Sequence, residues 1–282
     1  MKPAFQTIPI VVVAAALIIL GCTAPSFRLW HVGQKKVVSL QAAVPVLSRA
    51  QVVYIGETHD RPRDHQGQLE IIEAIHKSRR PVAIGLEMFQ RKNQPILDRW
   101  VSGEMDEETF ERHFQENWGA SWPLYRDIFV YCRSKKIPMV GLNVPREITS
   151  QVAQQGFSSL SKDQVGMLPT VTCRVDPEYI KIMRGAHGHA MSDAAFTHFC
   201  EAQLVWDTAM ATYSIEYLKH YPENVLVVLA GYFHAWKKGI PTQVQKQSPA
   251  FDQIVILPDG SGRFGRKDAS TEDCDYLLLN GA

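Results

Sequence analysis

The amino-acid sequence predicts an α/β fold with a mainly parallel central sheet that is flanked by helices. Short apolar runs without polar alternation recur along the chain, and segments with helical spacing of apolar residues separate them. Such runs are typical of parallel strands that are buried on both faces, and alternating strands and helices place helices on both sides of the sheet. Residues 143–224 contain no convincing strand, which predicts a helical insertion before the fourth strand.

The predicted elements follow in order along the chain. The strands share a composition rich in Val, Ile and Leu; they are Val52–Ile55, Val82–Leu86, Pro138–Leu142, Val225–Leu229 and Ile254–Leu257. The helices share apolar residues three or four positions apart; they are Arg63–Lys77, Pro123–Lys135 and Ser192–Tyr221. The last helix opens with Ser192 and Asp193, which are residue types that cap helix starts.

The N-terminal segment predicts export. An apolar run interrupted by one proline spans Ile8–Leu20. This run is shorter than the roughly 20 apolar residues that a membrane span needs, so we expect a signal peptide over residues 1–21.

The residues that close this run predict a lipid anchor. Ile-Leu-Gly-Cys is typical of bacterial lipoproteins, in which cleavage before Cys22 leaves a cysteine that carries acyl chains. Several chains hold a protein firmly at a membrane, whereas one binds only marginally. Thr23 stands where an acidic residue would mark inner-membrane retention, so we expect attachment to the outer membrane of the cell envelope. The alternative is an ordinary signal peptide with an incidental cysteine.

The mature chain is long enough for one large domain. We expect a tether over residues 22–40, the α/β domain over residues 41–262 and a polar, loosely held tail over residues 263–282. With 30 basic and 29 acidic residues, the chain has a net charge of +1, which gives no reason to expect a nucleic-acid partner. The spacing of the remaining cysteines matches no zinc finger and leaves their pairing open: Cys132, Cys173, Cys200 and Cys274.

Four of the predicted strands end in a glycine that is followed by polar or ionisable residues. The sequences there read GETH, GLEMF, GLNVPRE and GYFH. Ligands of parallel sheets bind in the crevice outside the carboxyl ends of the strands, and glycine permits close backbone approach. We therefore expect these side chains to converge on one crevice: Glu57, His59, Glu87, Asn143, Arg146 and His234. His65 joins them at the start of the next helix, where the helix dipole favours a negative group.

These residues are compatible with three kinds of site. His59, His234, Glu57 and Glu87 are ligand types for a divalent metal with an open position. Without a metal, a glutamate could orient a histidine as the general base of a hydrolase, so the same four residues would be catalytic. A porphyrin needs an apolar slot, an axial ligand and cations for its propionates. The chain offers further axial ligand types at Tyr179, His187, His189, His198, Tyr213 and Tyr232.

Each of these residues also has a structural interpretation. A single histidine of this kind is more often a loop cap, but two matching Gly-x-x-His sequences favour function for His59 and His234. Glu57 could pair with Arg61 or Arg63.

Similar alternatives apply to the other polar residues. Glu87 would be costly to bury without a basic partner or a role. Arg146 could form a surface ion pair or bind an anion. Gln203 and Asp207 lie four residues apart in an apolar helix, which favours fastening a neighbouring loop over direct catalysis. Core or lid positions are expected for Trp100, Trp118 and Trp122.

Five segments together resemble the ChaN-like family of haem-binding uptake lipoproteins, over roughly residues 40–260. They read VYIGETHDRPRDHQGQLEII, AIGLEMFQRKNQPILDRW, GLNVPREI, EAQLVWDTAMA and VLAGYFHAWKKGIP. That family is placed with the Tiki-type metalloproteases and the erythromycin-esterase-like hydrolases. The residues that match those relatives are Glu57, His59, Glu87 and His234. Tyr232 stands where many relatives have a smaller residue, so it could narrow the crevice or contact a ligand.

The resemblance implies haem binding during iron acquisition, with a tyrosine as iron ligand and a dimer that encloses the haems. No motif of this chain locates that tyrosine. We therefore expect an exported, lipid-anchored protein that binds haem, as an accessory in haem or iron uptake and as a homodimer. The first alternative is a hydrolase, an esterase or peptidase that uses the strand-end residues with or without a divalent metal. The second is a non-catalytic binding module.

Overall fold

The computed structural model describes residues 27–171, 175, 177–187, 191–261 and 264–279. The predictions for the signal peptide, for Cys22 and for the start of the tether lie outside this part of the chain. Within the described part, no helix is long and apolar enough to cross a membrane.

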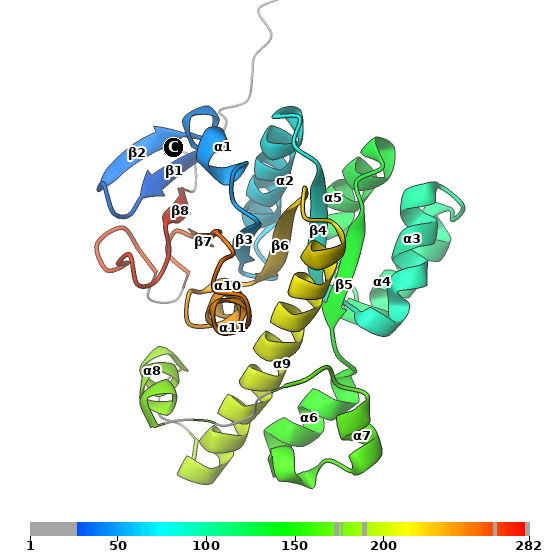
Figure 1. Ribbon diagram of the computed structural model, residues 1–282, viewed down its shortest axis with the longest axis vertical. Coiled ribbons are helices and arrows are strands. Elements are labelled where there is room, and N and C mark those ends of the chain that lie inside the picture. The colour runs from blue at the N-terminus through cyan, green and yellow to red at the C-terminus, as the bar shows by residue number, and fades with distance from the viewer. Residues whose placement is uncertain (1–26, 172–174, 176, 188–190, 262–263, 280–282) are drawn as a thin grey trace, which may run out of the picture.

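A single sheet forms the centre of the molecule (Figure 1). Its strands are β1 (Arg28–His31), β2 (Lys36–Ser39), β3 (Val52–Glu57), β4 (Val82–Gln90), β5 (Met139–Asn143), β6 (Val225–Gly231), β7 (Gln253–Pro258) and β8 (Tyr276–Leu279). They lie in the order β2-β1-β8-β7-β3-β6-β4-β5. The strands from β8 to β5 run parallel, whereas β1 is antiparallel to β8 and β2 is antiparallel to β1.

Helices cover both faces of the sheet (Figure 1). They are α1 (Leu40–Leu47), α2 (Pro62–Lys77), η1 (Arg91–Asn93), α3 (Gln94–Ser102), α4 (Glu107–Trp118), α5 (Trp122–Lys135), α6 (Arg146–Gln155), η2 (Phe157–Ser159), α7 (Lys162–Gly166), α8 (Pro177–His187), α9 (Asp193–His220), α10 (Tyr232–Ala235) and α11 (Ile240–Gln247). Successive residues of a strand point to opposite faces. In β3, Val53 and Ile55 therefore join the apolar cluster with α1 to α5, and Val52 and Tyr54 join the cluster with α8 to α11.

The predicted fold class is confirmed, and the five predicted strands are β3 to β7. The predicted helical insertion before the fourth of them is also present as α6 to α9. In Figure 1, α6, α7 and α8 lie below the sheet beside the first half of α9. Ser192 is the N-cap of α9, and its side chain accepts from the backbone N–H of Ala195. The sequence patterns missed α3 and α4.

The prediction of a tether and a loose tail was wrong for the parts that the structure describes. β1 and β2 form an antiparallel hairpin within the expected tether, and β8 lies within the expected tail. The physical reason is the open edge of β7, whose backbone groups need partners. Tyr276–Leu279 is a fully buried run that pairs with this edge, and the hairpin then covers β8.

The cysteines that the structure describes do not form disulfides with one another. Cys132, Cys200 and Cys274 are buried free thiols. Cys173 lies outside the described residues.

Candidate functional site

Four segments that are distant in the sequence meet at the carboxyl edge of the sheet. A cavity of about 490 Å³ there, which we call the strand-end cavity, is lined by His59 after β3, Glu87 from β4, Asn143 from β5 and His234 from α10. Arg146, at the start of α6, lines the same cavity. The sequence predicted that these residues converge, and the parallel sheet brings them together.

Glu57 is the last residue of β3 and is completely buried. Its carboxylate accepts a hydrogen bond from the Tyr125 hydroxyl. It also accepts one from Gln68 Nε2, with a donor–acceptor distance of 2.7 Å, and it lies 2.8 Å from His59 Nδ1. Burial would raise the pKa of Glu57, but the hydrogen bonds from His59 and Tyr125 and the charges of His59 and His65 hold it below its usual value. Glu57 is therefore an anion that its neighbours stabilise.

The expected arginine partners of Glu57 point elsewhere. Arg61 lies 3.8 Å from Asp64, and Arg63 stacks over the Phe27 ring at 4.8 Å. Glu57 instead pairs with the histidine two residues away.

Glu57 fixes the orientation of the His59 imidazole. Nδ1 of the ring faces Glu57, and the other ring nitrogen, Nε2, lies close to Gly231. A Cβ atom added to Gly231 would be 3.0 Å from His59 Nε2. The side chain is 48% exposed and its ring contacts Trp118 edge to face, with centroids 5.1 Å apart. Burial lowers the pKa of His59, but Glu57 and Glu87 raise it by more, so the net shift is upward. Glu57 thus holds Nδ1 of His59, and Nε2 is the nitrogen that a ligand could bind.

His234 repeats this pairing of an imidazole Nδ1 with a carboxylate. The single turn α10 presents the imidazole, whose Nδ1 lies 2.6 Å from Asp207 Oδ1 and whose ring contacts Trp206 edge to face, with centroids 5.6 Å apart. Its Nε2 is 3.7 Å from Glu87 Oε1. Burial opposes protonation, but Glu87 and Asp207 raise the pKa of His234 to about 9. Asp207 was expected to fasten a neighbouring loop to its helix. The residue that it holds is His234, which is itself a predicted site residue.

Glu87 has both a basic partner and backbone donors nearby. It is 6% exposed, and its Oε2 accepts the backbone N–H of Gly231 at 2.6 Å. Asn143 Nδ2 donates to the Glu87 backbone carbonyl at 2.7 Å, which ties the ends of β4 and β5 together. The Glu87 carboxylate thus joins β4 to the segment that carries His234.

The family comparison adds a decisive observation to this geometry. The family described as "Haem-binding uptake, Tiki superfamily, ChaN" matches residues 43–244. The chain belongs to this family.

The ChaN fold is also found among solved structures. The chain is similar to ChaN of Campylobacter jejuni, a structure described as showing cofacial haem binding, with a TM-score of 0.71, 19% identity and coverage of 92% of this chain and 98% of that one. A mutant of the erythromycin esterase EreC in its open conformation matches with a TM-score of 0.48 and 13% identity over 85% of this chain and 78% of that one. The first similarity shows a shared fold.

A plant protein resembles the chain in sequence. Protein RETICULATA-RELATED 5, chloroplastic, from Arabidopsis thaliana is 23% identical over 256 residues, which cover 84% of this chain. The chain spans about a third of the length of that relative, 35%.

Two other predicted residues of this ChaN-family chain, Tyr232 and His65, lie near the strand-end cavity but do not line it. Tyr232 lines a second cavity of about 240 Å³, together with Glu57, His59 and His234. His65 is buried behind Glu57, where its Nε2 lies 3.1 Å from the His59 carbonyl, so it supports the loop rather than lining the cavity.

Two predicted ligands lie in the helical insertion. Tyr179 is on α8, half-buried against the apolar cluster on that face of the sheet. His187 is the last residue of α8, and its side chain lies outside the described residues. Among the described residues, the linings of the two cavities at the carboxyl edge do not include Tyr179.

Sequence patterns missed several residues that support the site. The helix pattern relied on Leu124 and Tyr131, whereas α5 fully buries the neighbouring Tyr125, which reaches Glu57. Gln68 lies three residues after His65 on α2, and that spacing was an available signal. Trp206 lies directly before Asp207 in the resemblance segment on α9, and lines the cavity. Trp118 also lines it, while Trp100 and Trp122 are core residues.

The donor geometry does not favour a metal site of side-chain ligands. In the part of the chain that the structure describes, no group of three or more His, Cys, Asp or Glu side chains could hold a metal ion. What the site offers is the oriented His59 Nε2, indole surfaces and one exposed cation, Arg146.

Proposed function

We propose that this chain binds haem in the strand-end cavity. The observation that carries the proposal is the convergence of His59 and His234, each oriented by a carboxylate and bordered by a tryptophan, on one cavity. Membership of a haem-binding uptake family supports it.

The residues present fit the requirements of a porphyrin. An axial ligand is available at His59 Nε2, because Glu57 occupies Nδ1 and so leaves the other nitrogen for iron. Trp118, Trp206, Met88 and Val144 supply apolar surface in the lining. Arg146 supplies a cation at the rim for a propionate. Bound haem would supply the iron centre, and the chain would hold and orient it.

Haem titration tests this proposal. The mature chain should give a saturable Soret shift with haemin at micromolar concentration. His59→Ala should weaken the affinity by roughly tenfold or more, because it removes one ligand bond and the aromatic contact. His113→Ala is the matched control, since His113 lies on the solvent side of α4 and pairs with Glu116. Absence of saturable binding, or equal affinity in His59→Ala, would refute the proposed site.

Anchoring, localisation and assembly are further parts of the proposal. The Leu-Gly-Cys sequence supports attachment of acyl chains to Cys22 and a position at the outer membrane. The description of the family as haem-binding uptake supports an accessory role in haem or iron uptake. The resemblance of the five sequence segments supports a homodimer that encloses haem. Labelling with a fatty acid should be lost in Cys22→Ala. Sedimentation with and without haemin tests whether the dimer forms.

A hydrolase is the second candidate, and one observation favours it. The Glu57–His59 pair, at 2.8 Å, has the geometry of a general base with its orienting carboxylate, and the imidazole is half-exposed. His59 would take a proton from water as the water oxygen bonds to the carbonyl carbon of an ester or amide, and would pass that proton to the alcohol or amine as its bond to this carbon breaks. Ester and peptide hydrolysis by the wild type, lost in His59→Ala, would support this candidate. A wild type that is inactive across a broad substrate panel would remove it.

A further inference from the structure

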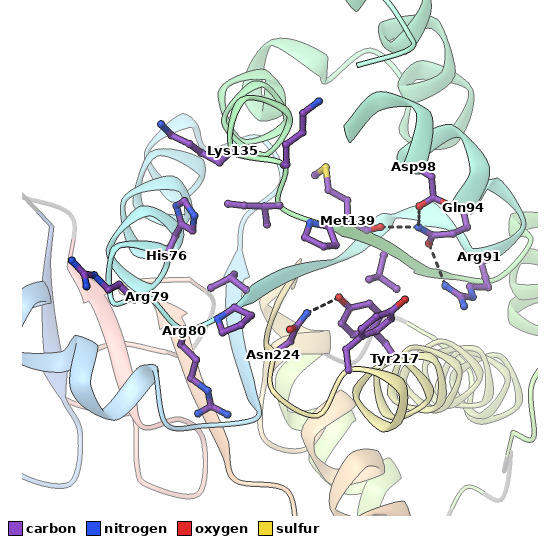
Figure 2. Close-up of a pocket in the computed structure, with 17 residues that line it drawn as sticks. His76, Arg79, Arg80, Arg91, Gln94, Asp98, Lys135, Met139, Tyr217 and Asn224 are labelled. Carbon is purple, nitrogen blue, oxygen red and sulfur yellow. Dashed lines mark hydrogen bonds between the residues drawn. The ribbon is translucent and has the colours of Figure 1, made fainter. Parts of the chain in front are cut away.

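A groove of about 700 Å³ lies at the opposite edge of the sheet, where β4, β5 and β6 begin. Its lining comes from the C-terminal ends of α2, α5 and α9 and from the start of α3 (Figure 2). Figure 2 shows Arg79 and Arg80 on one side of this groove and Gln94 and Arg91 on the other. The two linings share no residue, so this amino-edge groove is separate from the strand-end cavity.

Cations dominate the lining of the amino-edge groove. Its charged residues other than histidine are Arg79, Arg80, Arg91, Lys135, Lys136 and Asp98. Five cations and one carboxylate give a net charge of +4, against +1 for the whole chain. Three helices end here, and each C-terminus contributes about half a negative charge, roughly −1.5 together. The helix ends therefore explain only part of the positive charge.

Two of these cations already have structural partners. Arg80 donates to the backbone carbonyls of Ser48 and Arg49, at 2.7 and 3.0 Å. Lys136 Nζ donates to the carbonyls of Val101 and Ser102, at 2.9 and 2.7 Å. These two residues hold the walls in place.

Three other cations have donors to spare. Arg79 and Lys135 are exposed, and their side chains have no hydrogen-bond or ion-pair partner within the described part of the chain. Arg91 gives one N–H to Gln94 Oε1, at 3.2 Å, and its guanidinium carbon lies 5.7 Å from the centre of the Tyr213 ring, so its other N–H groups have no hydrogen-bond acceptor in the described part of the chain. Arg79 also has φ of +68°, a backbone conformation that usually favours glycine.

The rest of the groove is aromatic and apolar. The rings of Tyr217 and Tyr221 lie 4.9 Å apart at an interplanar angle of 34°. Asn224 Nδ2 donates to the Tyr217 hydroxyl at 2.8 Å, as Figure 2 shows, and this fixes the ring. Apolar surface comes from Val82 and Met139, at the starts of β4 and β5. An aromatic wall beside free cations is suited to a flat ring that carries anionic groups.

We propose that the amino-edge groove binds a planar aromatic compound with two or more carboxylate or phosphate groups. The ring would pack against Tyr217 and Tyr221, and the anionic groups would bind Arg79, Arg91 and Lys135. This site does not depend on haem binding at the strand-end cavity. A nucleotide and a porphyrin dicarboxylate both have this chemistry, and the test separates them.

The test uses two probes with the mature chain. Trinitrophenyl-ATP, followed by fluorescence, represents the nucleotide, and iron-free protoporphyrin IX, followed by absorbance, represents the dicarboxylate. At least one probe should bind saturably, with one probe molecule bound per chain at the groove. The double variant Arg79→Ala, Lys135→Ala should raise its Kd by roughly tenfold or more, since charge-assisted hydrogen bonds to anions are lost. Tyr221→Ala should weaken binding, and Tyr221→Phe should restore it.

The controls keep the two sites apart. Lys77→Ala removes a nearby cation that pairs with Glu73 and does not line the groove, so it should leave Kd unchanged. His59→Ala should also leave it unchanged. Circular dichroism should show that all variants are folded. The proposal is overturned if neither probe saturates, if the double variant binds as the wild type does, or if only protoporphyrin binds and only His59→Ala weakens it.

Discussion

At the scale of single residues, the strand-end cavity depends on how two imidazoles are oriented. Glu57 and Asp207 each bind an Nδ1 atom. This leaves His59 Nε2 for a ligand, whereas His234 Nε2 lies 3.7 Å from Glu87 Oε1. Gly231 has no side chain, and this makes room for the His59 ring. This arrangement leads to two predictions.

Gly231→Ala should impair the site without unfolding the chain. A Cβ there would lie 2.9 Å from His59 Cε1, while φ of −51° is accessible to alanine. Because His59 is half-exposed and can move, the free energy of unfolding should change by about 1 kcal/mol or less. Haem affinity should fall by about tenfold. Urea unfolding and Soret titration measure the two effects. In the control, Gly166→Ala, nothing lies within 4 Å of the new Cβ, and affinity should stay unchanged. Unaltered haem affinity in Gly231→Ala would contradict the role of His59.

His234 should make stability depend on pH. Its pKa is about 9 in the folded chain, against an ordinary value of 6.5. A raised folded-state pKa gives stability that is fully present below pH 6.5 and is lost as the pH rises to about 9. The free energy of unfolding should therefore fall by roughly 2–3 kcal/mol across that window. Urea unfolding at several pH values measures it. His234→Gln should flatten the dependence, whereas His113→Gln should preserve it; an equally steep fall in His234→Gln would be inconsistent with this explanation.

At the scale of elements, the antiparallel part of the sheet stabilises an edge that sequence patterns did not reveal. The four residues of β8 are all buried and lie between β7 and β1. Leu278 also packs on Gly67 of α2, where a Cβ would lie 2.4 Å from Leu278 Cδ2. β8 therefore belongs to the core.

Leu278→Ala should be strongly destabilising. Truncating a buried leucine removes apolar contacts and leaves a cavity, which costs about 2–5 kcal/mol. Urea unfolding should show this loss, while Val46→Ala, at a position that is 49% exposed on α1, should change stability by less than about 0.5 kcal/mol. Equal stabilities of the two variants would mean that β8 is dispensable.

The sequence predicted those elements whose signals are local. Val225–Leu229 is an apolar run that ends in Gly-x-x-His, and both features lie within one window of the chain. β1, β2 and β8 have only four residues each, which is too short for a clear pattern in the sequence. Their place in the sheet depends on the open edge of β7, which pairs with β8, and β8 in turn pairs with the hairpin. Tyr125 and Gln68 reach Glu57 only because α5 and α2 pack on the same face of the sheet. Such tertiary contacts have no pattern in the sequence.

At the scale of the whole molecule, the sheet separates two regions with different chemistry. Its carboxyl edge holds the carboxylate-oriented histidines, and its amino edge holds the cation-lined groove. Because the two linings share no residue, the two ligands that we propose would not compete for the same side chains. Haem at the carboxyl edge is the central claim.

Diffraction from crystals soaked with haemin, recorded at the iron absorption edge, locates the bound iron. We expect an anomalous iron peak inside the strand-end cavity, within bonding distance of His59 Nε2. An iron peak at the amino-edge groove, on α8 or elsewhere on the surface, with the strand-end cavity free of iron, would contradict it.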